Sequence, residues 1–477
     1  PYYDKNFLDR FVQHVRDQNA GDLSFDWYPH NAPGQWMHEN TNVPGTVITE
    51  PITLPRIADE LNREKYGYVV ISTYLSGYQT FTEIAKYVRK THPDVKVIAT
   101  SVGALIAETQ THADHIVRGN QVDDLRRIIG QPVTDPLKPV TIPAETKARF
   151  HGIEKHGNYA LLVSSFGCMY GCDMCPSTAQ FGHEYSSPFS PTQIRDSILA
   201  AHDSIAPESK VFTVSLAEPQ GLGDIRTWKE VFRITRDLPF QVNLVSTTSS
   251  KVLAHYSIEE LTQGALRLST VNIGVESLLQ GYKKNERVDL KKQIASLQDA
   301  GINAVCTFLV GLDWHSKENI KEEVRLLKNL DASGYIVANL EMQPGTPLYA
   351  RMKQKGRLLN VPPELLAFYG YQAYTHPNFA SGFTDMLPIL ENIESELAYG
   401  TRTFSANANI FLKRTNRFDK PVQKQMQTIL NSFREGIDLK QYTNDVSVVV
   451  DSFTAELFYH LAFRQMDLFH PFILSTN

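Results

Sequence analysis

Cys168-Met169-Tyr170-Gly171-Cys172-Asp173-Met174-Cys175 is the stretch that decides how this chain of 477 residues is interpreted. Its three cysteines follow the spacing C-x3-C-x2-C, and no fourth cysteine lies nearby. Cysteine thiolates are the usual ligands of iron–sulfur clusters, which normally take four of them. Three cysteines therefore predict a [4Fe–4S] cluster with one iron left open for another ligand, much as a catalytic zinc keeps an open position.

A structural zinc site or a chance grouping is the simpler interpretation of the same cysteines. Zinc usually takes four ligands, often as two pairs, and the nearest candidate for a fourth, His183, lies at no recognised spacing. Disulfides do not fit either, because four cysteines in a chain of this size do not make a secreted scaffold. Compared with a zinc site or a disulfide, an iron–sulfur cluster is the interpretation that the three cysteines favour.

Composition and charge describe an ordinary globular protein. The chain is 42% hydrophobic and 21% charged, with a net charge of −5. That charge argues against a general nucleic-acid binder, and no apolar run approaches the about 18–20 residues that span a membrane. With reduced cysteines, these features predict a cytoplasmic protein without nucleic-acid or membrane partners, built from two or three domains of roughly 100–200 residues each.

Apolar runs alternate with amphipathic stretches in the middle of the chain. The candidate strands are Leu161–Phe166, Val211–Leu216, Gln241–Thr247, Val271–Glu276, Ala304–Gly311 and Tyr335–Met342. The stretches between them with helical spacing include Pro191–Asp203, Asp289–Ala300 and Ser316–Leu330. Such alternation predicts a parallel sheet covered by helices. Where such a sheet closes into a barrel, the catalytic residues lie at the carboxyl ends of the strands.

Polar and glycine-rich motifs follow these predicted strands one after another. The cysteine stretch follows the first strand, and the later motifs are Ala217-Glu218-Pro219, Ser246-Thr247-Thr248, Gly274-Val275-Glu276-Ser277, Leu309-Val310-Gly311-Leu312-Asp313 and Gln343-Pro344-Gly345-Thr346-Pro347-Leu348-Tyr349. Each motif alone is common, and the last is first of all a turn. Their order and spacing as a set carry the inference.

This set resembles the radical S-adenosylmethionine (SAM) superfamily, and within it the enzymes that carry an N-terminal cobalamin-binding-type domain. The resemblance implies a partial (β/α)6 barrel in which SAM chelates the open iron. It also implies that an electron from a flavodoxin- or ferredoxin-type donor reduces the cluster, which then cleaves SAM to a 5′-deoxyadenosyl radical.

The resemblance also assigns roles to residues. Cys168, Cys172 and Cys175 would bind the cluster, and Glu218 with Pro219 looks like the motif that holds the SAM amino group. The remaining positions of the implied SAM pocket are Met174, Ser246, Thr247, Glu276, Val310 and Gly311. Tyr170 is a candidate catalytic residue that either reaches the substrate or shields the cluster from water. Cys306 is expected to be a buried apolar residue.

Residues 1–145 show a doubly wound, Rossmann-like α/β pattern. Strands are predicted at Tyr68–Thr73 and Val95–Thr100, and helices at Tyr78–Lys90 and Val122–Ile129. Ligands of such sheets bind outside the carboxyl ends of the strands. The candidate residues at that edge are Ser72, Thr73, Ser101, Gly103, Arg118 and Gly119.

The N-terminal pattern resembles a cobalamin-binding domain with two departures. The D-x-H-x-x-G motif that supplies a histidine to cobalt is absent, and neither His112 nor His115 fits its spacing. The second turn reads Ser101-Val102-Gly103 where the family has Gly-Gly. The domain therefore binds cobalamin without a histidine ligand, only shapes the active site, or binds another ligand, and fold alone does not decide among these.

The last region, residues 357–477, is predicted to be mostly helical and to cap the barrel. Pro362-Pro363 marks its beginning after a barrel at 146–356, and helices are expected at Asp385–Tyr399, Pro421–Glu435 and Thr454–Leu468.

The motifs and the resemblance together predict a radical SAM enzyme that transfers a methyl or alkyl group to an unactivated centre of a small molecule. The expected setting is natural-product or cofactor biosynthesis. One alternative dispenses with cobalamin and transfers another SAM fragment, such as the 3-amino-3-carboxypropyl group, or drives a rearrangement or cyclisation. A second alternative is a non-enzymatic iron–sulfur or corrinoid carrier.

Overall fold

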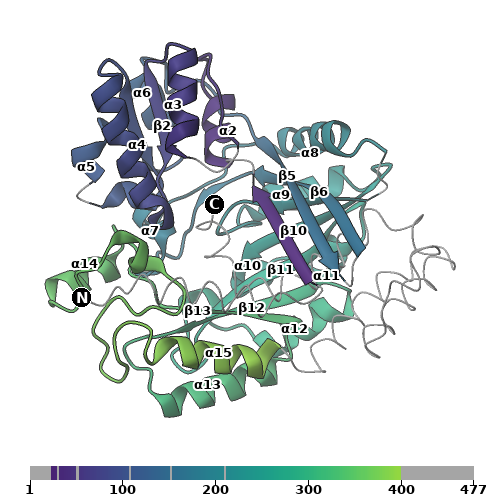
Figure 1. Ribbon diagram of the computed structural model, residues 1–477. Coiled ribbons are helices and arrows are strands. Elements are labelled where there is room, and N and C mark those ends of the chain that lie inside the picture. The colour runs from purple at the N-terminus through teal and green to yellow at the C-terminus, as the bar shows by residue number, and fades with distance from the viewer. Residues whose placement is uncertain are drawn as a thin grey trace.

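An eight-stranded sheet forms the centre of the computed structural model, which describes residues 23–29, 32–49, 53–106, 109–150, 153–208 and 211–398 (Figure 1). In spatial order its strands are β1 (Leu23–Pro29), β5 (Val140–Phe150), β6 (Ile153–Val163), β9 (Val211–Leu216), β10 (Gln241–Thr248), β11 (Leu266–Glu276), β12 (Asn303–Val310) and β13 (Gly334–Asn339). The strands from β6 to β13 are parallel to one another. β1 and β5 extend the sheet in antiparallel pairing.

Helices between the parallel strands cover one face of this sheet. They are α8 (Pro191–Ile205), α9 (Ile225–Ile234), α10 (Ser250–Leu253), α11 (Ile258–Thr262), α12 (Leu290–Asp299) and α13 (Lys317–Leu330). A serine or aspartate side chain caps the amino end of each, as Ser190 does for α8 and Asp289 for α12. Such caps stabilise a helix by about 1 kcal/mol each. The capping serine or aspartate therefore fixes the residue at which each helix begins.

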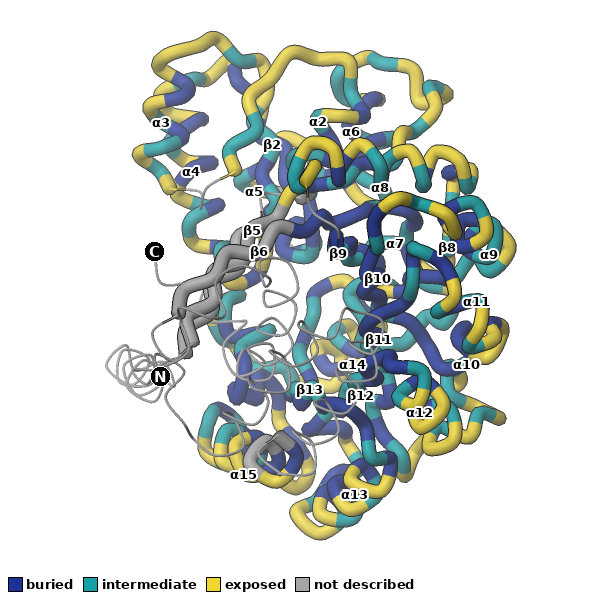
Figure 2. The backbone as a smooth tube through the Cα atoms, turned by 90° about the vertical axis from the view of Figure 1, so that its right-hand side faces the viewer, coloured by how far each residue is buried: buried dark blue, intermediate teal, exposed yellow. Residues whose placement is uncertain are grey.

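The alternation of side chains along the strands separates a packed face from an inner face. Val214, Leu244 and Ile273 are fully buried in one core with helix residues such as Ile194. The residues between them in sequence are less buried and more polar, among them Thr213, Ser215, Thr247, Asn272 and Thr307. In Figure 2 the strands from β9 to β13 are mostly dark blue, and the outer surfaces of the helices are yellow. The inner face is therefore the side that offers polar groups.

A second, smaller sheet belongs to the N-terminal part. Its parallel strands lie in the order β2 (Tyr68–Ser72), β3 (Lys96–Thr100) and β4 (His115–Ile116). The helical segments around it are α2 (Ala32–Glu39), α3 (Leu54–Arg63), η1 (Leu75–Gly77), α4 (Tyr78–Thr91), η2 (Val102–Leu105), α5 (Thr109–His112) and α6 (Val122–Ile128). Ile84 and Val97 lie in a core that is separate from the one behind the large sheet.

The described part of the C-terminal region packs into both cores. It follows α14 (Pro347–Gln354), and its helical elements are η4 (Pro363–Ala367) and α15 (Met386–Ala398). Leu390 of α15 joins the core of the large sheet, and α15 lies against β13 and α13. Tyr371 and Tyr374 join the N-terminal core instead. This segment therefore connects the two halves of the molecule.

The mixed α/β class expected from the sequence is confirmed. β9 has the predicted bounds, and the predicted helix at Asp385–Tyr399 corresponds to α15. The predicted helices Pro421–Glu435 and Thr454–Leu468 lie outside the described residues. The antiparallel pair β1 and β5 was not expected, and β6 begins well before the predicted Leu161. Among the described residues, none of the helices combines the length and apolar character needed to cross a bilayer.

Candidate active site

The cysteine loop lies directly after β6 and is closed by a short hairpin. The hairpin pairs β7 (Phe166–Gly167) with β8 (Tyr185–Ser186), and α7 (Pro176–Phe181) begins right after Cys175. Gly171 has a φ of +58°, and a side-chain carbon there would lie 1.9 Å from Nδ1 of His183. Only glycine fits this position, and His183 packs against the loop.

The three thiols share this loop and are all half-buried. Burial raises the pKa of Cys168, and it raises that of Cys172 to about 11. Nowhere in the described residues do three histidine, cysteine or acidic side chains converge as a single metal ion requires.

Glu218 connects the end of β9 to the end of β6. Its Oε1 accepts hydrogen bonds from the backbone N–H groups of Ser164 and Ser165, the latter at 2.8 Å. Its Oε2 is buried and has no hydrogen-bond partner. Burial raises the pKa of Glu218 to about 7. One carboxylate oxygen thus fixes the loop, and the other is left for a donor; the neighbouring Pro219 is exposed.

The residue after β10 forms a hydrogen bond with Tyr170 of the cysteine loop. Ser249 Oγ donates to the Tyr170 hydroxyl at 3.0 Å. Gln220 donates from Nε2 to Thr248 Oγ1 at 2.6 Å, and the Sγ of Cys168 lies 4.0 Å from Gln220 Oε1.

The two predicted hydroxyl residues of β10 differ in their surroundings. Ser246 is buried beside Gly221, where a side-chain carbon would come within 2.4 Å of its Oγ. Thr247 is half-buried and follows the alternation onto the inner face. Of the two, Thr247 is therefore the residue that a ligand inside the sheet can reach.

β11 ends in Glu276, whose φ is +63° and whose carboxylate forms an ion pair with Lys284. Lys284 comes from η3 (Lys283–Asn285) and was not predicted from the sequence. Its charge acts on both Cys168 and Cys172. A side-chain carbon on Gly274 would lie 2.3 Å from the Lys284 Nζ, so the glycine makes room for the ammonium.

β12 ends in a turn that the C-terminal segment holds in place. Val310 is fully buried in the core of the large sheet, so its side chain does not line the inner face. Gly311 has a φ of +95°, its N–H donates to His315 Nδ1 at 3.1 Å, and its carbonyl accepts a hydrogen bond from Tyr374. Met174 is half-buried against the N-terminal core.

The carboxyl edge of the N-terminal sheet brings together four of the six predicted residues. Gly103 N–H donates to the Thr73 carbonyl at 2.7 Å, and Ser101 adopts a φ of +69°. The hydroxyls of Ser72 and Thr100 are buried there without partners. Arg118 and Gly119 lie on a separate turn, which Asp124 of α6 holds by accepting the Arg118 N–H at 3.1 Å.

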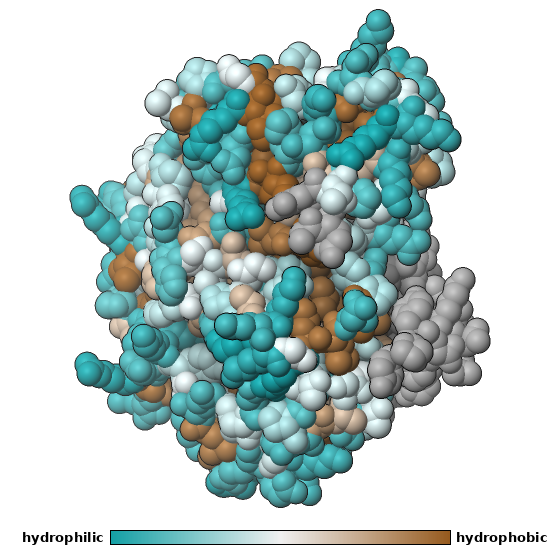
Figure 3. All heavy atoms as spheres, turned by 90° about the vertical axis from the view of Figure 1, so that its left-hand side faces the viewer, coloured by the Kyte–Doolittle hydropathy of each residue, from teal (hydrophilic) through white to brown (hydrophobic). Residues whose placement is uncertain are grey.

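This edge adjoins the cysteine loop. η2 contacts α7, and a side-chain carbon on Gly345 would lie 2.6 Å from Leu105 and 3.3 Å from Ala179 of α7. Tyr74, which the sequence analysis missed, is 51% exposed at the same edge and hydrogen-bonds to Ser101. Figure 3 shows hydrophobic side chains gathered across the middle of the face on the α5 and α14 side.

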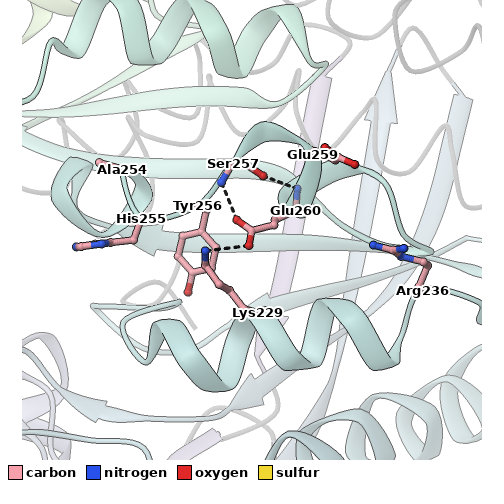
Figure 4. A pocket seen from close by; sticks show the side chains of 8 residues that line it. All are labelled: Lys229, Arg236, Ala254, His255, Tyr256, Ser257, Glu259 and Glu260. Atoms are coloured by element: carbon pink, nitrogen blue, oxygen red, sulfur yellow. Dashed lines mark hydrogen bonds and ion pairs between the residues drawn. The ribbon is translucent and has the colours of Figure 1, made fainter.

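A surface hollow of ≈ 600 Å³ lies elsewhere, against α9 and α11 (Figure 4). Its Glu260 accepts a hydrogen bond from the Ser257 N–H at 2.8 Å and pairs with Lys229 at 2.8 Å. Lys229 and Glu260 thus pair with each other, and no predicted site residue lines the hollow.

No protein-family model matches the chain, and no curated protein matches its sequence. Solved structures with a similar fold are radical SAM methyltransferases. One is TsrM from Kitasatospora setae with cobalamin and a [4Fe–4S] cluster bound, at a TM-score of 0.53 and 12% identity over 80% of this chain and 91% of that chain. Another is TsrM with tryptophan substrate and the SAM analog aza-SAM bound, at a TM-score of 0.50 and 14% identity over 77% and 81%.

The TM-scores show a shared fold, and at 12–14% identity the similarity shows the fold alone. The resemblance to radical SAM enzymes with an N-terminal cobalamin-binding-type domain, inferred from the motifs, is confirmed at that level.

Proposed function

We propose that this protein is a cobalamin-dependent radical SAM enzyme that transfers a methyl or alkyl group to a small-molecule substrate. The observation that carries the proposal is a loop with three half-buried thiols whose first residues are bound by one oxygen of Glu218, while the other oxygen is buried without a partner. When bound, a [4Fe–4S] cluster supplies one-electron chemistry to SAM, and cobalamin supplies a carrier for the methyl group.

The cluster would be held by Cys168, Cys172 and Cys175. Their loop is built for such a group, because Gly171 lets it turn tightly and the Cys168 N–H is bound to the Glu184 carbonyl at 3.1 Å. A flavodoxin- or ferredoxin-type protein is the proposed electron donor.

SAM would lie across the strand ends of a partial (β/α)6 barrel formed by β6 to β13. The free Oε2 of Glu218 suits an ammonium group, since a buried carboxylate oxygen is costly without a donor. Thr247, Glu276 and the backbone at Gly311 complete the proposed pocket, and Tyr170 of the cysteine loop would either reach the substrate or shield the cluster from water.

Cobalamin would bind at the carboxyl edge of the N-terminal sheet. The unpartnered hydroxyls of Ser72 and Thr100 are the kind of groups that a polar ligand there would satisfy. The contact of η2 with α7 would bring that ligand next to the cluster. The chain offers no histidine at the usual position, so the proposed binding uses none. The proposed domains remain 1–145, 146–356 and a capping region at 357–477.

The test is anaerobic reconstitution with iron, sulfide and hydroxocobalamin, followed by desalting and a visible spectrum. Iron–sulfur absorbance with retained corrin bands supports the proposal, and SAM with a reductant should then yield cleaved or demethylated SAM. Absorbance without corrin bands would favour transfer of another SAM fragment or a rearrangement. That second candidate draws support from Ser101, because its turn departs from the glycines of the cobalamin pattern. A cluster that leaves SAM intact would point to a carrier.

A further inference from the structure

Lys284 is a mostly buried cation whose charge acts on the cysteine loop. Its side chain is 14% exposed and that of its partner Glu276 is 13% exposed. The ammonium reaches this place over Gly274, where any side chain would collide with it. The pair lies near the cysteine loop, because Ser249 donates to Tyr170 of that loop at 3.0 Å and the next residue, Ser250, donates to the Lys284 carbonyl at 3.2 Å. A buried ion pair is costly to assemble, so its place beside this loop calls for an explanation.

The backbone that carries Lys284 is held firmly. Asn285 donates from Nδ2 to the Gly274 carbonyl at 2.8 Å and to the Val275 carbonyl at 3.3 Å. Ser250 Oγ donates to Asn285 Oδ1 at 2.8 Å. These hydrogen bonds join η3 to both β11 and α10, and they hold the backbone of Lys284 in place. The preceding residue, Lys283, is exposed.

The groups that act electrostatically on Lys284 come from two elements. Glu276 belongs to β11, and Cys172 and Cys175, which attract Lys284 as thiolates, belong to the cysteine loop. Burial lowers the pKa of Lys284, but the attraction and hydrogen bond of Glu276, together with these thiolates, outweigh burial and raise it above its usual value. Lys284 is therefore positively charged at neutral pH, and its charge is felt at the cysteines.

We infer that the Lys284–Glu276 pair sets the reduction potential of the cluster, with Lys284 favouring the reduced form and Glu276 opposing it. The inference rests on the cluster proposed at the three cysteines. One-electron reduction by a flavodoxin- or ferredoxin-type donor adds one negative charge at the cysteine loop. A nearby cation stabilises that charge and a nearby anion destabilises it, and both effects are strong where water is scarce. Local charge is among the factors that set cluster potentials.

The experiment is a redox titration of the reconstituted full chain, without SAM, followed by the electron paramagnetic resonance signal of the reduced cluster. Lys284→Met should lower the midpoint potential and Glu276→Gln should raise it. Each change should alter the reduction equilibrium at least tenfold, which is about 59 mV for one electron. The double variant should return close to the wild type, and Lys283→Met, the exposed neighbour, should not shift.

The outcomes separate the two proposals. A wild-type chain that assembles no cluster overturns both. A wild-type cluster whose midpoint is unchanged in Lys284→Met and Glu276→Gln, or moves in the same direction in both, overturns the inference and leaves the proposed function standing. If Lys284→Met fails to assemble, Lys284→Arg should keep the wild-type midpoint while Glu276→Gln still raises it; a Glu276→Gln midpoint that does not rise overturns the inference.

Discussion

The backbone N–H of Leu348 donates a hydrogen bond of 2.9 Å to the carbonyl of Asp173, which joins the start of α14 to the middle of the cysteine loop. Arg351 adds an ion pair of 2.6 Å to the Asp173 carboxylate. Residues far apart in sequence are thereby clamped together. The Pro-Gly-Thr-Pro turn, which looks like an ordinary turn in the sequence, therefore supports the loop of the proposed cluster.

Arg351→Ala should weaken this clamp with little effect on overall stability. Both side chains are partly exposed, and such pairs contribute about 0–1 kcal/mol. We expect the reconstituted cluster to lose iron to a chelator several-fold faster, while the melting temperature changes little. Arg325→Ala, which removes a matched pair with Glu322 on α13, is the control. Equal rates of iron loss in the two variants would contradict the proposed support.

Gly171→Ala should prevent stable cluster binding. The positive φ costs about 1–2 kcal/mol for a residue with a side chain, and the new carbon would collide with His183. Iron content after reconstitution should fall sharply. Gly356→Ala also places a side chain at a positive φ, +64°, but with no atom within 4 Å, and should bind iron normally. Partial recovery in Gly171→Ala/His183→Ala would assign the loss to the collision.

Cys172→Ala should abolish the cluster and with it all SAM cleavage, since only three thiols hold the proposed group. Cys306→Ala should keep both and lose about 1 kcal/mol of stability, because Cys306 is fully buried in the core. Iron analysis and product analysis by mass spectrometry measure the difference. An intact cluster in Cys172→Ala would refute the ligand assignment.

Glu218 should make the stability of the iron-free protein depend on pH. Its folded pKa, about 7, lies above the ordinary value of 4.5, so the folded state holds the proton more tightly than the unfolded state. This stabilisation is complete below about pH 4.5 and is lost as pH rises to about 7. The loss is on the order of 3 kcal/mol, at 1.36 kcal/mol per pKa unit.

Urea unfolding of the wild type and of Glu218→Gln between pH 5 and 8 measures this contribution. The difference between the two proteins should grow with pH in favour of the variant, because glutamine does not ionise. Parallel pH profiles would mean that Glu218 is not the group responsible.

Much of the large sheet could be predicted from the sequence, because β9, β10 and β12 are short apolar runs and each covering helix begins at a capping serine or aspartate. The pairing of β1 with β5 could not be predicted. It joins Leu23 to Phe150, and no local sequence pattern indicates a partner so far along the chain. Antiparallel extension of this kind is decided by tertiary contacts.

The site was predictable where motifs follow strand ends and less so where burial decides. The sequence located Glu218, but only the structure shows that one of its oxygens is taken by Ser164 and Ser165. Val310 was expected in the pocket, and strand alternation turns its side chain into the core. Lys283 and Lys284 are indistinguishable in the sequence; the fold exposes the first and buries the second.

The shared N-terminal core has a consequence for how the chain is made. Ile84 and Val97 pack in the same cluster as Met342 and Tyr374. Ribosomes release the N-terminal residues first, and most domains fold as soon as they emerge. Here the first sheet keeps an uncovered apolar side until residues beyond 340 have been synthesised. Fragments that stop before that point should aggregate, and the nascent chain should depend on chaperones for longer than a self-sufficient first domain would.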